Sequence, residues 1–226
     1  MKTINEYNHS WYMTTKAGAI YRKISGQFTT LYDIVRDYKL TGTSLAKYVN
    51  SIDKSKSTGS ESTRYWSLDT IFKGFDFNQK GNFIDIGCGK GRVLAYMHSK
   101  GYKGKLFGIE HNPAVAEFTN QWADKKDNIT IFSGDAFNLN CNDYSFMFFN
   151  RPFTQDVFAQ FVKKIESEMT HELTILCYAD TYMSKALKQS GKWEKQDENV
   201  IFKKGILAYS YYPLRYTIWK YNPTSK

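Results

Sequence analysis

A glycine-rich turn follows a short apolar run near the middle of the chain. Residues 83–86, Phe-Ile-Asp-Ile, are typical of a buried parallel strand, and Gly87, Gly89 and Gly91 alternate directly after them. Because glycine has no Cβ, such a turn bends sharply and lies against a ligand that side chains would exclude. We therefore predict a nucleoside-cofactor site here, the alternative being a strand that simply ends in a flexible turn.

The glycine spacing distinguishes between nucleoside cofactors. The dinucleotide-binding pattern needs a third glycine or alanine where this chain has Arg92. A phosphate-binding loop is excluded as well, since Gly91 follows Lys90 where that motif needs a Ser or Thr to reach magnesium. The pattern favours adenosine without phosphates.

Two further apolar runs end in acidic residues at regular spacing. Glu110 ends the run 106–110 and lies 25 residues after Asp85, and Asp135 ends the run 129–135 after another 25 residues. One βαβ unit separates two strand ends by about this distance, and an acid at the second strand end is placed to bind both ribose hydroxyls. A fourth run, 144–149, leads into Asn-Arg-Pro-Phe at 150–153, where ligands of open α/β sheets are expected to react.

With these residues the chain resembles the class I S-adenosylmethionine-dependent methyltransferases, over roughly residues 60 to 221. The resemblance implies an α/β fold with a doubly wound, mostly parallel seven-stranded sheet, a C-terminal antiparallel hairpin and S-adenosyl-L-methionine as cofactor. It places the glycine turn under the methionine portion, Glu110 at the ribose, and Asp135 with Ala136 beside the adenine. His111 packs on the adenine or is a solvent-exposed loop residue. The cofactor-binding residues it implies are Thr63, Tyr65, Asp85, Gly87, Cys88, Gly89, Gly91, Glu110, His111, Asp135 and Ala136.

The sequence Asn150-Arg151-Pro152-Phe153 resembles the N-P-P-F signature of methyltransferases that modify planar amines or amides. The resemblance implies that the Asn150 side-chain oxygen and the Arg151 carbonyl accept hydrogen bonds from the target nitrogen, while Phe153 stacks on the planar group. The chain departs from the signature at Arg151, which puts a nucleobase target in doubt and suits a carboxylate or phosphate on the substrate. A residue before proline is held extended, so we expect Arg151 to be extended. In the alternative interpretation, Asn150 only bonds the backbone of a strand-to-helix turn.

The choice of acceptor atom depends on the need for a base. A neutral amine attacks a methyl sulfonium once it is held in line, whereas a hydroxyl needs a general base. His98 and His171 are not obviously placed to serve, so N-methylation of an amine or amide is favoured. The alternatives are O-methylation of a small molecule, an aminopropyl-transfer type of enzyme, or a non-catalytic RNA-binding module on the same fold.

The cysteines and the apolar runs of the chain indicate the environment in which the protein works. Its three cysteines, Cys88, Cys141 and Cys177, form no C-x-x-C pair, which suits a reducing cytoplasm and predicts no metal site. No apolar run approaches 18 residues, so no membrane partner is expected.

The net charge of +9 is unevenly distributed along the chain. Residues 1–75, 76–150 and 151–226 carry +5, 0 and +4, so the excess lies outside the expected cofactor core. An anionic partner and a generally basic soluble protein both fit this distribution. Neither the methyl acceptor (a protein side chain, a nucleobase or a small amine) nor the oligomeric state can be read from it.

The chain divides into two predicted parts: an N-terminal helical cap and connector at 1–60, and a methyltransferase domain at 61–226. In the first part, Ile20, Ile24, Leu31, Ile34, Val35 and Tyr38 fall at near-helical spacing. In the second, we expect helices over 63–72, 93–99, 154–169 and from Asn112-Pro113, a strand over 173–178, and strands over 192–203 and 206–221 joined at Lys204-Gly205.

Overall fold

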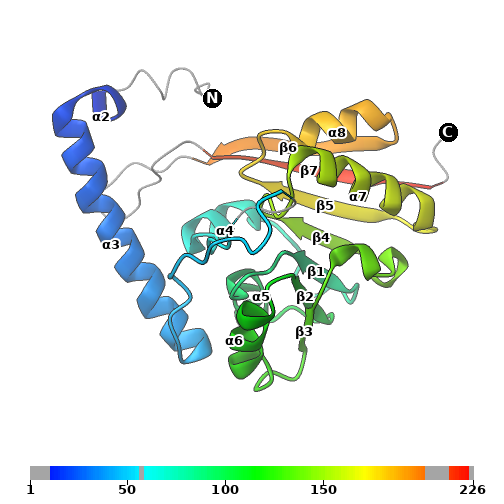
Figure 1. Ribbon diagram of the computed structural model, residues 1–226, viewed down its shortest axis with the longest axis horizontal. Coiled ribbons are helices and arrows are strands. Elements are labelled where there is room, and N and C mark those ends of the chain that lie inside the picture. Colours follow the sequence, from blue (N-terminus) through cyan, green and yellow to red (C-terminus); the bar gives the residue numbers. More distant parts are fainter. Residues whose placement is uncertain (1–10, 56–58, 202–213, 224–226) are drawn as a thin grey trace.

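A seven-stranded sheet is the centre of the computed structural model, which describes residues 11–55, 59–201 and 214–223 (Figure 1). Its strand order is β3-β2-β1-β4-β5-β7-β6, with β1 to β5 parallel and β7 antiparallel to both of its neighbours. The strands are β1 (Phe83–Ile86), β2 (Leu106–Glu110), β3 (Ile129–Ser133), β4 (Phe146–Phe149), β5 (Leu173–Tyr178), β6 (Trp193–Ile201) and β7 (Leu214–Tyr221). The predicted fold class is confirmed.

The helices connect these strands and cover both faces of the sheet. They are α2 (Trp11–Thr14), α3 (Lys16–Thr41), α4 (Tyr65–Ile71), α5 (Arg92–Ser99), α6 (Pro113–Ala123), α7 (Gln155–Glu168) and α8 (Met183–Ser190), with short 3-10 turns η1 (Ala136–Asn138) and η2 (Cys141–Asp143). Side chains of α4, α5 and α6 pack on one face and those of α7 and α8 on the other. The predicted start of α6 at Asn112-Pro113 is also confirmed, because the Asn112 side chain caps the helix by accepting the N–H of Ala114 and Pro113 is its first residue.

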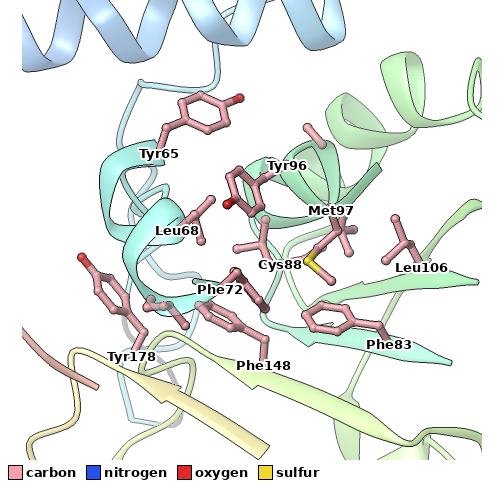
Figure 2. Packing of buried hydrophobic residues seen from close by; sticks show 14 of the residues in the cluster. Tyr65, Leu68, Phe72, Phe83, Cys88, Tyr96, Met97, Leu106, Phe148 and Tyr178 are labelled. Atoms are coloured by element: carbon pink, nitrogen blue, oxygen red, sulfur yellow. The ribbon is translucent and has the colours of Figure 1, made fainter. Parts of the chain in front are cut away.

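An aromatic-rich core joins the sheet to the helices on the first of these faces (Figure 2). Phe72 lies at its centre, with ring contacts to Phe83 of β1, Tyr96 of α5 and Phe148 of β4. These residues come from segments far apart in the sequence, so their packing fixes α4 and α5 against β1 and β4. The carboxyl ends of the central strands are thereby held in place.

The C-terminal hairpin ends the sheet on the β5 side. Strand β7 pairs with β5 and with β6, so the later strand lies inside and β6 forms the edge. The predicted turn at Lys204-Gly205 and the start of the second predicted strand lie outside the described residues.

Helix α3 forms the predicted N-terminal helix, but its apolar stripe does not face the body of the protein. The residues it buries are small or polar, among them Ser25, Thr29, Asp33 and Asp37. Most of its large apolar side chains, including Ile24 and Leu31, are exposed, whereas Leu40 is partly buried against the core. The usual arrangement of a surface helix is therefore reversed. The division at residues 60 and 61 stays a prediction.

None of the helices in the described part of the chain is both long and apolar enough to span a membrane.

Candidate functional site

A cavity of about 480 Å³ lies at the carboxyl ends of β1, β2 and β4. Its other wall consists of residues 48–52 and 59–63, two segments joined by paired backbone hydrogen bonds between Val49 and Ser60. The cavity is placed where open α/β sheets bind ligands. Sequence-predicted residues that line it are Thr63, Asp85, Gly87, Cys88, Gly89, Glu110, His111, Asp135, Ala136, Asn150, Arg151, Pro152 and Phe153.

The glycine turn has backbone conformations that favour glycine. Gly87 and Gly89 have φ of 70° and 52°, in the left-handed region. A Cβ on Gly87 would lie 2.5 Å from Cβ of Pro152, and one on Gly89 would lie 2.2 Å from Oγ of Ser60. The turn is therefore in close contact both with the segment after β4 and with the wall formed by 59–63.

Two predicted cofactor residues do not line the cavity. Gly91, with φ of 79°, packs on α6, where a Cβ would lie 2.6 Å from Cζ2 of Trp122. Tyr65 is fully buried beneath Arg36 and Arg92, whose guanidinium carbons lie 4.5 and 5.3 Å from its ring centre. Both residues thus pack on elements around the site and do not line the cavity.

Two of the four acidic residues that line the cavity, Asp85 and Glu110, are buried. Glu110 accepts the N–H of Gly89 through Oε2 and that of Asn112 through Oε1, each at 2.9 Å, so it joins the glycine turn to the start of α6. Burial raises the pKa of Glu110 despite these bonds. Burial, with the nearby charge of Glu110, raises the pKa of Asp85 well above its usual range. A cation in the cavity would favour the ionised form of both groups.

The predicted adenine-side residues lie at the ends of β2 and β3. Asp135 caps η1 by accepting the N–H of Phe137 at 2.9 Å, and the buried Ala136 follows it. His111 is solvent-exposed at the cavity edge. Phe137 also lines the cavity and was missed by the sequence analysis, although its position two residues after Asp135 was a usable signal.

The residues after β4 form a strained turn. The Asn150 side chain donates through Nδ2 to the Glu61 carbonyl and to Thr63 Oγ1, at 3.3 and 3.1 Å. Since a carbonyl can only accept, these bonds fix the orientation of the amide and leave Oδ1 as its acceptor. Arg151 has φ of 47°, so the expectation of an extended residue before proline was wrong. The chain turns too sharply between Asn150 and Pro152 for an extended residue, and such strain is concentrated at functional sites.

The rings near this turn form an aromatic wall. The ring of Phe153 lies 5.3 Å from that of Phe161 and 6.1 Å from that of Phe137. Tyr182 donates a hydrogen bond to the Phe153 carbonyl. The backbone and ring of Phe153 are therefore both held from the α7 and α8 side.

Arg92 has a structural role that the sequence analysis did not assign. Its Nε and Nη2 donate to the two carboxylate oxygens of Asp37 at 2.9 and 2.7 Å. Its Nη1 donates to the carbonyls of Ser62 and Thr63 at 3.3 and 3.4 Å. Asp37 also accepts the N–H of Leu45. One buried guanidinium therefore ties α3 and the cavity wall to the end of the glycine turn.

Two of the described histidines, His98 and His171, lie outside the cavity. The Nδ1 atom of His98 bonds Asn128, and both ring nitrogens of His171 bond backbone carbonyls, those of Glu172 and Asn142. Within the described ranges, no group of three or more His, Cys, Asp or Glu side chains could hold a metal ion.

The chain is similar to known proteins in sequence over part of its length and in fold. A sequence model of the methyltransferase domain matches residues 83–167, which run from β1 into α7. No curated protein sequence matches the chain.

Similar solved structures include a methyltransferase from Pyrococcus furiosus, at 13% identity and TM-score 0.58, covering 88% of this chain and 98% of that one. An RNA methyltransferase from Salinibacter ruber in complex with S-adenosyl-L-homocysteine is 14% identical with TM-score 0.52, covering 73% and 94%. A precorrin-6y C5,15-methyltransferase from Geobacter metallireducens is 16% identical with TM-score 0.51, covering 77% and 95%.

Residues 83–167 thus match a methyltransferase domain and the chain has the class I methyltransferase fold, which together imply S-adenosylmethionine as cofactor. The acceptor is not specified, because the similar structures include enzymes named for RNA and for a precorrin.

Proposed function

We propose that this enzyme methylates a nitrogen of an amine or amide group. The observation that carries the proposal is the fixed amide of Asn150 at the carboxyl end of β4. Its Nδ2 is committed to Glu61 and Thr63, so Oδ1 is the atom that accepts a hydrogen bond from an incoming N–H. Arg151, whose backbone is in the left-handed conformation, also lines the cavity next to Asn150.

The cavity residues fit the cofactor that the class implies. S-adenosylmethionine supplies an electrophilic methyl group on a positively charged sulfonium. Asp85 and Glu110 are buried carboxylates whose pKa values are raised by burial. A positively charged ligand would offset the free-energy cost of keeping them ionised. Gly87 and Gly89 also line the cavity, and neither carries a side chain of its own that would fill it.

Catalysis in this proposal comes from positioning and electrostatics. Asn150 Oδ1 orients the acceptor nitrogen so that its lone pair faces the methyl carbon, and it stabilises the positive charge that develops on nitrogen. Phe153, held by Phe137 and Phe161, provides a flat face for a planar group. Segments 48–52 and 59–63 cover the cavity on the side away from the sheet and limit access of water.

The placement of the histidines supports nitrogen over oxygen, since the one described histidine that lines the cavity, His111, follows Glu110 at the predicted ribose end and not Asn150. Two of the chain's four histidines, His98 and His171, are engaged away from the cavity. A hydroxyl acceptor would need a general base beside Asn150, whereas a neutral amine would not.

The test is methyl transfer by the Asn150→Ala variant. Isotope-labelled S-adenosylmethionine is incubated with the enzyme and with protein, nucleic-acid and small-molecule fractions of a cell extract. In the fraction that accepts label, we expect kcat to fall about 100-fold or more while cofactor affinity changes less than about threefold.

Two controls sharpen this experiment. Asn78→Ala, outside the cavity, should leave turnover unchanged. Spectroscopic identification of the labelled product distinguishes a methyl on nitrogen from one on oxygen. Equal losses of turnover and cofactor affinity in Asn150→Ala, or an O-methylated product, would contradict the proposal.

A further inference from the structure

The outer face of α3 is apolar and its inner face is polar. Seven large side chains on the outer face are between 45% and 62% exposed: Ile20, Ile24, Phe28, Leu31, Tyr32, Val35 and Tyr38. The inner face contacts the protein body through Ser25, Thr29, Asp33, Asp37 and Thr41. Figure 1 shows α3 at the rim of the molecule, with no labelled helix or strand on its outer side. An apolar face of this size on a helix of a water-soluble domain indicates an interaction surface.

The spacing of the outer residues fits a second helix. Alternate steps of three and four residues link Tyr21, Ile24, Phe28, Leu31, Val35 and Tyr38. This is the 3.5-residue repeat of a seam between two packed helices. From Tyr21 to Tyr38 the seam is about 26 Å long at 1.5 Å per residue. A long, narrow ridge of this kind matches the groove of another helix better than it matches a flat surface.

The area offered is large enough for a stable pair. The seven exposed side chains present about 700 Å² of apolar surface, if about half of each is accessible. A standard protein–protein interface buries about 800 Å² per partner. The rest would come from the side chains that flank the seam.

The charge pattern favours a second copy of this chain. The flanking positions outside the buried face are Ile20, Gln27 and Ile34 on one side and Tyr32 and Lys39 on the other, so Lys39 is the only ionised residue among them. An antiparallel partner across a two-fold axis near residues 29 and 30 places Phe28 against Leu31 and Ile24 against Val35. Such a seam is self-complementary, as a two-fold interface requires, and it buries no like charges at its centre.

We infer that the protein forms a homodimer in which the α3 helices of two chains pack antiparallel through this seam. The inner face of the same helix holds Arg92 and Leu45 through Asp37. Pairing of the outer faces therefore stabilises the helix on which the cavity wall depends. This inference is independent of the acceptor and is tested without a methyl-transfer assay.

The first experiment measures the mass of the full-length protein in solution by sedimentation. We expect twice the monomer mass of 26.3 kDa, and a dimer dissociation constant at least about 30-fold higher for Leu31→Glu. Lys23→Gln makes the same change in charge on the same helix outside the seam and should leave the dimer intact. A thermal melt checks that each variant is folded. A wild-type monomer, or equal effects of both variants, would overturn the inference.

The second experiment tests the antiparallel arrangement by oxidative cross-linking. The double variant Phe28→Cys, Leu31→Cys should form a covalent dimer, whereas Ile24→Cys alone should not, because residue 24 faces residue 35. The native cysteines Cys88, Cys141 and Cys177 are buried and do not interfere. Cross-linking of Ile24→Cys alone would indicate parallel helices and contradict the arrangement. If the protein is monomeric and binds anionic lipid vesicles through this face, then the face is a membrane-binding surface and the homodimer is contradicted.

Discussion

At the scale of single residues, Asp85 and Glu110 set the charge that the cavity accepts. Both lie at the carboxyl ends of neighbouring parallel strands, β1 and β2, and both are buried. Burial raises their pKa values, and the charge of Glu110 raises that of Asp85 further. Without a ligand, keeping both carboxylates ionised lowers the free energy of unfolding. With a cationic ligand between the glycine turn and these acids, the same charges contribute binding energy.

We expect Asp85→Asn to stabilise the ligand-free protein at neutral pH and to weaken cofactor binding. A raised pKa means that the folded state binds the Asp85 proton more tightly than the unfolded state does. The stability from Asp85 is therefore fully present below its unfolded pKa and is lost as pH rises through the folded pKa. The gain in free energy of unfolding from Asp85→Asn should therefore increase as pH rises from the unfolded pKa of about 3.9 to the raised folded pKa, measured by urea denaturation at a series of pH values without cofactor.

The same variant should bind S-adenosylmethionine at least about tenfold more weakly at neutral pH, since a charge-assisted contact is lost. Calorimetric titration measures this loss. A variant that is less stable than wild type at pH 8 yet binds the cofactor normally would show that Asp85 only supports the fold.

At the scale of elements, the ion pair between Asp37 of α3 and Arg92 of α5 connects the N-terminal helix to the cofactor turn. Both side chains are almost fully buried and share two hydrogen bonds. Arg92 follows Gly91, so any shift of α3 is transmitted to the turn that lines the cavity. Arg92, the residue that excludes the dinucleotide-binding pattern, thus anchors the cavity wall.

We expect Asp37→Asn to lower the free energy of unfolding by about 3 to 5 kcal/mol, because it leaves a buried guanidinium inadequately paired. It should also weaken cofactor binding, since the Leu45 backbone and the wall at 62–63 lose their anchor. Chemical denaturation and cofactor titration measure the two effects.

Asp69→Asn is the matched control for this experiment. Its ion pair with Arg36 has an N–O distance of 3.0 Å, but the Asp69 side chain is 40% exposed. Removing an exposed pair should cost at most about 1 kcal/mol and leave cofactor affinity unchanged. Similar losses in both variants would mean that the buried pair has no special connection to the cavity.

At the scale of the whole molecule, the cavity is built from segments between residues 48 and 160. A ligand that contacts so many segments stabilises the folded chain as one unit, by an amount set by its concentration relative to its Kd. At about 100 times its Kd, S-adenosylhomocysteine should add about 2.7 kcal/mol and raise Tm by roughly 5 to 10 °C.

NAD is the control for this thermal shift, because Arg92 occupies the place of the third dinucleotide glycine. It should leave Tm unchanged. A larger shift with NAD or with decarboxylated S-adenosylmethionine would favour another nucleoside-binding enzyme on the same sheet.

The sequence by itself determined the order of strands and helices and the residues at the strand ends. Apolar runs that end at or next to Asp85, Glu110 and Asn150 could be read directly, and the parallel topology brings such ends to one edge of the sheet. These features depend on local periodicity and on spacing along the chain, so a single sequence carries them.

The tertiary structure alone decided how the N-terminal part meets the sheet. The Asp37–Arg92 pair joins residues 55 positions apart, and Asn150 bonds Glu61 across 89 positions. No local pattern encodes such contacts, so Arg92 could not be assigned a role, and the packing of Tyr65 and Gly91 on elements outside the cavity could not be foreseen. The same reason applies to α3: its periodicity predicted a helix, but buried ion pairs far along the chain determined which face turned inward.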